Sequence, residues 1–176
     1  MSGIIVIPAA EDNYIYLITD GTNAAVVDPL LAEPVMRVVQ ERGLGLELIL
    51  LTHGHADHTG GVQELKERYG SRVIGPDKEI ALVDDVPADN AAISVGTRTV
   101  HVLTTPGHTP NAFSFYLLPD EQDPAGAVFT GDTMFIGGCG RLFGGEPQTL
   151  FNSRKKLADL PDDTAVYPGH EYALEN

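Results

Sequence analysis

Four residues with metal-binding side chains fall within one short segment, at His53, His55, Asp57 and His58. Imidazole nitrogens and carboxylate oxygens are ligands that suit zinc, iron or manganese. The residues that separate the first three ligands are a glycine and an alanine, so the backbone can turn tightly between them. So short a loop can direct two side chains to one metal ion and two to a neighbouring ion. The segment therefore predicts a metal centre, and its lack of thiolates favours a catalytic centre over a closed structural site.

Three further residues of ligand type are expected near this cluster, namely His108, Asp132 and His170. Each follows a glycine at the end of an apolar stretch. Alone, each would be a weak signal, because a histidine after a strand is usually an ordinary polar residue and an aspartate there can form a turn or cap a helix. Functional residues concentrate on loops held by a rigid scaffold, so the shared position of these three predicts that they join the centre.

Two other residues with metal-binding side chains are expected to play no part in the centre. His101 falls in the middle of a predicted strand, away from the loops, and is interpreted as structural or exposed. Cys139 is expected to be a packed or half-buried thiol, because histidine and aspartate already supply enough ligands for the predicted centre.

The elements that must position these residues alternate along the chain. Strands are expected at residues 4–7, 14–19, 24–28, 46–51, 72–74, 97–104, 113–118, 127–130 and 164–167. Helices are expected between Pro34 and Gly43, at residues 60–69 and at residues 147–160. Each predicted ligand loop directly follows a predicted strand. This order predicts one domain built as a sandwich of sheets with helices outside.

Composition excludes several classes of function. The formal net charge of −14 opposes binding to nucleic acid, whose phosphates would be repelled. No stretch approaches the roughly 20 apolar residues of a membrane span, and residues 1–8 are interpreted as a first strand and not as a signal peptide. A single cysteine rules out an internal disulfide and fits a reducing, cytoplasmic environment.

Four motifs resemble those of the metallo-β-lactamase superfamily: Thr52-His53-Gly54-His55-Ala56-Asp57-His58, Gly107-His108-Thr109, Gly131-Asp132-Thr133 and Gly169-His170-Glu171-Tyr172. The stretch from Gly131 to Arg141 and the closing Gly169-His170-Glu171-Tyr172 are similar to the glyoxalase II group, the hydroxyacylglutathione hydrolases. The resemblance covers essentially the whole chain. It implies an αββα sandwich, with two mixed sheets and helices on their outer faces.

The resemblance also implies the ligand set and the reaction. It implies two divalent metal ions, with zinc as the first expectation and iron or manganese as alternatives. One ion would be held by His53, His55 and His108, the other by Asp57, His58 and His170, and Asp132 would bridge them. A water shared by two such ions supplies hydroxide near neutral pH, which would attack a thioester carbonyl. Asp57 is expected both to ligate a metal and to orient this nucleophile.

Three residues are expected to contact the substrate, a small thioester of glutathione. Arg141 offers a cation for a carboxylate or amide group. Phe143 stands where the family often has tyrosine, so a hydroxyl contact is expected to be lost, whereas Tyr172 is retained. The family usually continues into a C-terminal helical region that adds glutathione contacts. Here the expectation is a single domain over residues 1–176 without that region.

Other functions on the same fold remain open from the sequence. Persulfide dioxygenases, which use a single iron, share His55-Ala56-Asp57-His58 and Gly138-Cys139-Gly140-Arg141, but Gly169-His170-Glu171-Tyr172 favours the hydrolase. A lactamase, another hydrolase of the superfamily, or a non-catalytic metal-binding module are the remaining alternatives. Counting the metal ions per chain and assaying thioester cleavage and oxygen uptake side by side distinguish these functions.

Overall fold

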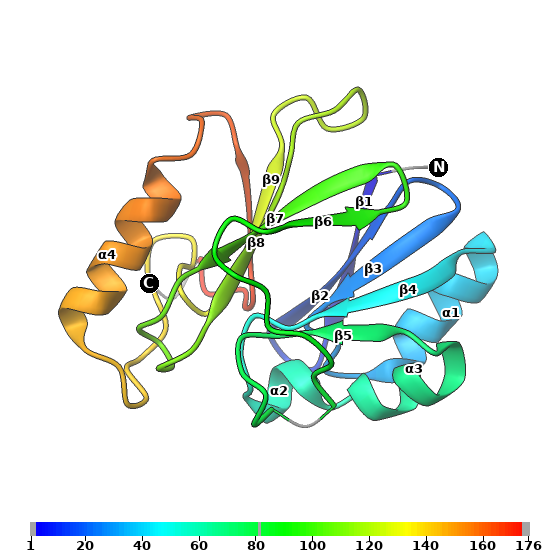
Figure 1. The fold of residues 1–176 in the computed structure, drawn as a ribbon, viewed down its shortest axis with the longest axis horizontal. Coiled ribbons are helices and arrows are strands. Elements are labelled where there is room, and N and C mark those ends of the chain that lie inside the picture. The colour runs from blue at the N-terminus through cyan, green and yellow to red at the C-terminus, as the bar shows by residue number, and fades with distance from the viewer. Residues whose placement is uncertain (1–2, 81, 174–176) are drawn as a thin grey trace.

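Two five-stranded sheets face each other, with helices on both outer sides (Figure 1). The computed structural model describes residues 3–80 and 82–173. The first sheet has the order β1-β2-β3-β4-β5, with strands Gly3–Ala9, Asn13–Thr19, Asn23–Val27, Gly45–Leu50 and Arg72–Ile74. The second has the order β10-β9-β8-β7-β6, with strands Ala165–Pro168, Ala127–Gly131, Phe113–Leu117, Arg98–Thr104 and Ala92–Val95. Both sheets mix parallel and antiparallel pairs, which confirms the predicted αββα sandwich.

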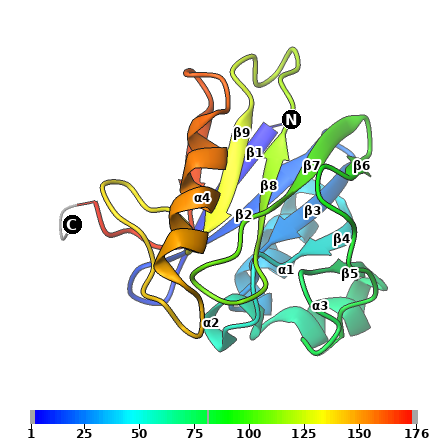
Figure 2. The same ribbon diagram turned by 60° about the vertical axis from the view of Figure 1, so that its left-hand side comes forward.

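The helices form the outer layers of this sandwich. Helices α1 (Ala32–Arg42) and α3 (Val62–Tyr69) cover the first sheet, and α4 (Pro147–Ala158) covers the second. Figure 2 shows α4 lying along the outer face of β8 and β9. The one-turn helix α2 (Ala56–Thr59) lies instead at the end of the first sheet, in the loop that carries the histidine cluster.

Three hydrophobic clusters correspond to the three layer interfaces. Strand β2 is almost entirely buried because both of its faces pack against apolar layers. Ile15 and Leu17 pack in the cluster that includes α1 and α3, whereas Tyr16 and Ile18 pack in the cluster between the sheets. A strand with an apolar layer on each face needs no polar alternation. A smaller third cluster joins the second sheet to α4 through Leu157.

Most of the predicted elements are confirmed, and the ends of two helices fall at glycines. Gly43 and Gly70 follow α1 and α3 with φ of 63° and 68°, the left-handed conformation that ends a helix. Helix α3 begins at Val62, two residues later than predicted. A Cβ on Gly60 would lie 2.5 Å from the carbonyl oxygen of Leu30, and one on Gly61 would lie 2.6 Å from a backbone nitrogen of α1. These glycines therefore allow close approach of two backbones.

Two elements were not predicted, and several boundaries differ by one or two residues. Strand β6 is short and mostly exposed on one face, and α2 lies within a segment that was interpreted only as a ligand loop. Helix α4 ends at Ala158, two residues before the predicted end. In the described ranges, none of the helices combines the length and apolar character needed to cross a membrane.

Candidate metal centre

All seven predicted ligands lie in loops that follow the carboxyl ends of strands. The loop after β4 carries four of them, and the loops after β7, β9 and β10 carry His108, Asp132 and His170. The first sheet supplies one loop and the second sheet supplies three. The loops meet at one edge of the sandwich, where their ligand atoms form two adjoining groups.

The first group contains three imidazoles and one carboxylate. Nε2 of His53 lies 3.0 Å from Nδ1 of His55, which in turn lies 3.1 Å from Nε2 of His108. Oδ2 of Asp132 lies 3.4 Å from Nε2 of His108. Ligands about 2.0–2.1 Å from a tetrahedral zinc ion lie roughly 3.3 Å from one another. The spacing of these four atoms therefore suits one cation.

The second group adjoins the first across Asp132. Nε2 of His58 and Nε2 of His170 lie 3.3 Å apart, and Oδ2 of Asp57 lies 3.6 Å and 3.3 Å from them. The other oxygen of Asp132, Oδ1, lies 3.4 Å and 3.5 Å from the same two nitrogens. Each oxygen of Asp132 thus faces a different group of ligand atoms.

The surroundings of Asp132 are those of a carboxylate that needs a cation. The residue is buried, and its Oδ1 atom is enclosed without any hydrogen-bond donor among the described residues. Burial is the main cause that raises the pKa of this carboxyl, against the opposing effect of three neighbouring imidazoles. A buried carboxylate oxygen without a donor is costly unless a proton or a metal ion neutralises it. The donor set and this oxygen fit a divalent metal ion.

Asp28 lies behind the cluster and orients two of its histidines. Its carboxylate accepts hydrogen bonds from the backbone amide of Thr52 (2.8 Å), from the hydroxyl of Thr52 (2.6 Å) and from Nδ1 of His58 (2.9 Å). Because that hydroxyl donates to Asp28, it accepts from Nδ1 of His53 at 3.0 Å. Asp28, His53 and His58 also form a group that could hold an ion. Because the Asp28 carboxylate already accepts three hydrogen bonds, we interpret it as a positioning residue and not as a further metal ligand.

His108 and His170 also direct Nε2 toward the ligand groups, and each is held by a hydrogen bond from its Nδ1 atom. Nδ1 of His108 donates to the carbonyl of Arg141 at 2.7 Å, and Nδ1 of His170 donates to Oδ1 of Asp12 at 2.9 Å. With the proton on Nδ1, a neutral imidazole presents the lone pair of Nε2 inward. Lone pairs that converge at the distances given above repel one another unless a cation lies between them. Such outer partners are typical of metal-binding histidines.

Without a metal ion, protonation of a histidine supplies the positive charge. Burial lowers the pKa of His58, but the carboxylates of Asp28, Asp132 and Asp57 outweigh that effect and raise it to about 9. Burial and the adjacent imidazoles lower the pKa of His53 far below its ordinary value. The cluster therefore retains a positive charge beside the carboxylates, and a metal ion would displace that proton on binding.

Asp57 differs from the other ligand-type residues because its side chain is 46% exposed. The amide of Asn13 donates to the Asp57 backbone carbonyl (3.2 Å) and to its Oδ2 atom (3.4 Å). Burial would raise the pKa of Asp57, but His58, the Asn13 amide and other neighbours lower it overall. An ionised carboxylate thus faces the cavity beside the second group.

The predicted substrate residues line a cavity of about 660 Å³ over the metal cluster. Arg141, Phe143 and Tyr172 all contribute to its wall. The ring of Phe143 lies edge-on to that of His55, with centroids 5.1 Å apart. The ring of Tyr172 stacks on that of His170 at 5.1 Å and an interplanar angle of 4°. Phe143 therefore borders the first group of ligand atoms, and Tyr172 borders the second.

His101 and Cys139 lie outside the ligand groups found among the described residues. His101 is half-buried in β7, which agrees with its interpretation as a structural residue. Cys139 is a half-buried free thiol on the wall of the 660 Å³ cavity. That this thiol borders the cavity was not predicted.

Three residues that orient the centre were missed in the sequence. Asp12, Asn13 and Asp28 lie far from the ligand motifs along the chain, and none of them belongs to a recognisable pattern. The one available signal was at Asp28, which follows the apolar strand β3 and precedes a proline. Asp28 thus directly follows a strand, as the loops that carry the predicted ligands do.

Comparison with known proteins agrees with this geometry. Residues 10–170 match the protein family described as the metallo-beta-lactamase superfamily. A hydroxyacylglutathione hydrolase of Chromohalobacter salexigens is 45% identical over 179 residues, covering 100% of this chain and 69% of the relative. A hydroxyacylglutathione hydrolase of a Synechococcus strain is 43% identical, covering 97% and 69%.

Solved structures share the fold over nearly the whole chain. ETHE1 from Myxococcus xanthus superposes with a TM-score of 0.82 at 32% identity, covering 97% of this chain and 76% of the other. A protein solved in a di-iron-bound form superposes with a TM-score of 0.76, also at 32% identity, covering 96% and 92%. Taken with the family match and the relatives above, these likenesses establish that the chain belongs to the metallo-β-lactamase superfamily, in its hydroxyacylglutathione hydrolase (glyoxalase II) group.

Proposed function

We propose that this chain is a metal-dependent hydrolase that cleaves 2-hydroxyacyl-glutathione thioesters, of the S-D-lactoylglutathione type, into a hydroxy acid and a free thiol. The observation that carries the proposal is the pair of adjoining ligand groups, with one oxygen of Asp132 facing each. Relatives 40–46% identical to the chain are named for this activity. We also propose that residues 1–176 form a single domain and that it acts in the cytoplasm.

In this proposal His53, His55 and His108 would hold one divalent ion, Asp57, His58 and His170 would hold the other, and Asp132 would contribute to both. When bound, such ions would supply hydroxide by lowering the pKa of water to about 7 and would polarise the carbonyl. Zinc suits this donor set, and the similar structure with two irons supports iron as an alternative.

The residues around the cluster complete the chemistry. The exposed carboxylate of Asp57, fixed by Asn13, accepts a hydrogen bond from the attacking water and orients it toward the carbonyl carbon. A thiolate leaving group has a pKa of about 8.5, so it departs without a strong acid beside it. Arg141 pairs with a carboxylate of the peptide, while Phe143 and Tyr172 supply aromatic surface.

One experiment separates this function from its alternatives. The purified protein is analysed for metal content, and the same preparation is assayed for S-D-lactoylglutathione cleavage and for oxygen uptake. We expect close to two metal ions per chain, thioester cleavage and no oxygen uptake. A single iron per chain with oxygen consumption would instead favour the dioxygenase, because the first ligand group alone provides four ligand atoms for one ion.

A further inference from the structure

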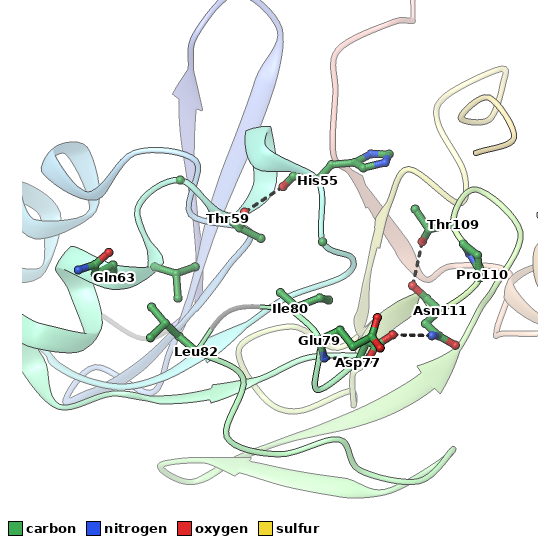
Figure 3. A pocket seen from close by; sticks show the side chains of 13 residues that line it. His55, Thr59, Gln63, Asp77, Glu79, Ile80, Leu82, Thr109, Pro110 and Asn111 are labelled. Atoms are coloured by element: carbon green, nitrogen blue, oxygen red, sulfur yellow. Dashed lines mark hydrogen bonds between the residues drawn. The ribbon is translucent and has the colours of Figure 1, made fainter. Parts of the chain in front are cut away.

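A second cavity, of about 550 Å³, has His55 of the first ligand group in its wall. Figure 3 shows that its walls come from three segments: the α2–α3 region, residues 77–80 with residue 82, and residues 109–111. His55 lines both this cavity and the one that contains the predicted substrate residues. The two cavities therefore meet at a residue of the first ligand group.

The chemistry of this second cavity differs from that of the first. Its wall combines four apolar side chains and the backbone of two glycines with four uncharged polar side chains. The apolar residues are Val62, Ile80, Leu82 and Pro110, and the polar ones are Thr59, Gln63, Thr109 and Asn111. Two carboxylates, those of Asp77 and Glu79, stand at its rim, and its described lining includes no lysine or arginine. Such a lining suits an uncharged group that presents apolar surface to part of the wall and a hydroxyl or other polar atom to the rest.

The walls of this cavity are held in place by hydrogen bonds. The amide of Asn111 donates to Oδ2 of Asp77 at 2.7 Å, which links two of the three segments. The hydroxyl of Thr59 donates to the carbonyl of His55 at 3.1 Å. Ile80 packs against the ligand loop so closely that a Cβ on Gly54 would lie 2.9 Å from its Cγ1 atom. The cavity wall is therefore continuous with the loop that presents His55.

A thioester carbon carries its sulfur and its acyl chain on diverging bonds. Arg141, Phe143 and Tyr172 all line the first cavity, and none of them lines the second. If the peptide and the sulfur lie beside those three residues, the acyl chain must leave the reacting carbon in another direction. The second cavity shares His55 of the first ligand group with the first cavity, so it offers such a direction.

We infer that the second cavity receives the acyl group of the thioester, an inference that rests on the function proposed above. Its apolar wall favours neutral 2-hydroxyacyl groups larger than lactoyl, such as mandeloyl. Its two rim carboxylates disfavour acyl groups that carry a carboxylate of their own. Ile80 and Glu79 are the residues that distinguish these acyl groups.

The size preference is tested with S-D-lactoylglutathione and S-D-mandeloylglutathione on the metal-loaded protein. Because apolar contacts in a binding pocket change kcat/KM by about tenfold or more, Ile80→Ala is expected to lower kcat/KM for mandeloyl about tenfold. The value for lactoyl should stay within about twofold, because the smaller group reaches less of the apolar wall. Ile5→Ala is the matched control, since Ile5 is a partly buried isoleucine of β1 outside both cavities. An equal loss for both substrates in Ile80→Ala would overturn the inference.

The charge preference is tested with S-butyrylglutathione and S-succinylglutathione, which differ by a terminal carboxylate. The native protein should prefer butyryl, and Glu79→Lys should raise kcat/KM for succinyl several-fold with little change for butyryl. Glu47→Lys makes the same change of charge on an exposed glutamate of β4 that does not line the cavity. If both lysine variants raise succinyl turnover equally, the effect is one of overall charge and the rim has no such role.

A binding measurement keeps the inference separate from the proposed function. S-phenacylglutathione is a thioether that carries an aromatic acyl-like group and cannot be hydrolysed. On its addition, the methyl NMR signals of Ile80 should shift and those of Ile5 should not. If the protein cleaves no thioester but the Ile80 signals shift, the proposed reaction is wrong and the cavity assignment stands. If thioesters are cleaved and the Ile80 signals stay unchanged, the cavity assignment is wrong.

Discussion

The carboxylate of Asp28 accepts three hydrogen bonds, and one of them fixes the ring of His58. Replacing it with asparagine removes the negative charge that favours the Nδ1–H of that ring. Loss of an outer partner typically lowers metal affinity by about 10–100-fold, so Asp28→Asn should release the ion of the second group first. Titration with a coloured chelator measures the two affinities. Two ions held as tightly as in the native protein would contradict this role.

Arg141 is the cation on the wall of the cavity that carries the predicted substrate residues. Its guanidinium would contact the peptide and not the reacting carbon, so its loss should weaken binding in the ground state and the transition state alike. Arg141→Ala is therefore expected to raise KM for S-D-lactoylglutathione, with a smaller effect on kcat. A small thioester without the peptide provides the control. Equal kcat/KM for the two substrates in the native protein would mean that no glutathione pocket exists here.

At the scale of residues, spacing along the chain predicted which side chains would meet but not what holds them. The short cluster and the three glycine-flanked residues could be recognised because their pattern is local or repeated. Asp12 and Asn13 become neighbours of His170 and Asp57 only through the folding of distant segments. No local pattern records such a contact. The metal-binding role of the seven residues stays a prediction until metal content is measured.

Among the elements, the turn after β10 allows almost no space beside the metal centre. A Cβ on Gly169 would lie 2.6 Å from Oδ1 of Asp132 and 2.8 Å from Cε1 of His58. Gly169→Ala should therefore displace ligand atoms of the second group and lower metal content toward one ion per chain. Gly70→Ala is the control, because a Cβ there meets nothing within 4 Å. That control should lose about 1 kcal/mol of stability from its left-handed conformation and keep both ions.

Arg98 of β7 ties the loop after β8 to the second sheet. Its buried guanidinium contacts Asp120 at 2.8 Å and Asp123 at 2.5 Å. Burial alone would raise the pKa of Asp120, but the backbone amide of Asp123 and the Arg98 guanidinium lower it overall. Because the pKa of Asp120 is lower in the folded state than in the unfolded state, its ionised form stabilises the fold. This stabilisation is fully present above the unfolded-state pKa of about 4 and is lost as the pH falls through the folded-state pKa.

Arg98→Met should therefore destabilise the protein most at neutral pH, by several kcal/mol, because it leaves two carboxylates without their cation. The difference in unfolding free energy between native and variant proteins should shrink below about pH 4, as Asp120 becomes protonated. Urea unfolding of both proteins at pH 7 and pH 3.5 measures this difference. An unchanged difference would show that the ion pairs do not stabilise the loop.

The regular elements were easier to predict than the irregular ones. Continuous apolar runs marked β2 and β4, because each packs against layers on both faces. Strand β6 has only Val95 fully buried among its four residues, so its pattern does not differ from that of a loop. The helix α2 is a single turn, too short for a periodic pattern. Its place is determined by the ligand loop and not by its own propensity.

Across the whole molecule, the candidate centre joins the two sheets. The first sheet contributes the loop after β4, and the second contributes the loops after β7, β9 and β10. A metal ion that binds only the folded state stabilises it by about 2.7 kcal/mol at a concentration of 100 Kd. In a chain of this size each kcal/mol raises Tm by about 2–4 °C, so removal of each metal ion should lower Tm by roughly 5–10 °C.

Thermal unfolding with excess zinc and with a chelator measures this shift. Asp132→Ala provides the control, because it removes the carboxylate that faces both ligand groups. Its Tm should respond to zinc less than that of the native protein. If the chelator leaves the native Tm unchanged, the centre does not join the sheets in the way proposed.

The loop that carries His170 also pairs with the opposite end of the chain. The amide of Tyr14 donates to the carbonyl of Gly169 at 2.9 Å, and Asn13 forms a β-bridge with His170. The first ligand group draws only on residues 53–132, whereas the second also needs His170, whose loop is held by the N-terminal hairpin. Occupation of the second group would therefore depend on the contact between these two distant parts of the chain, and occupation of the first would not.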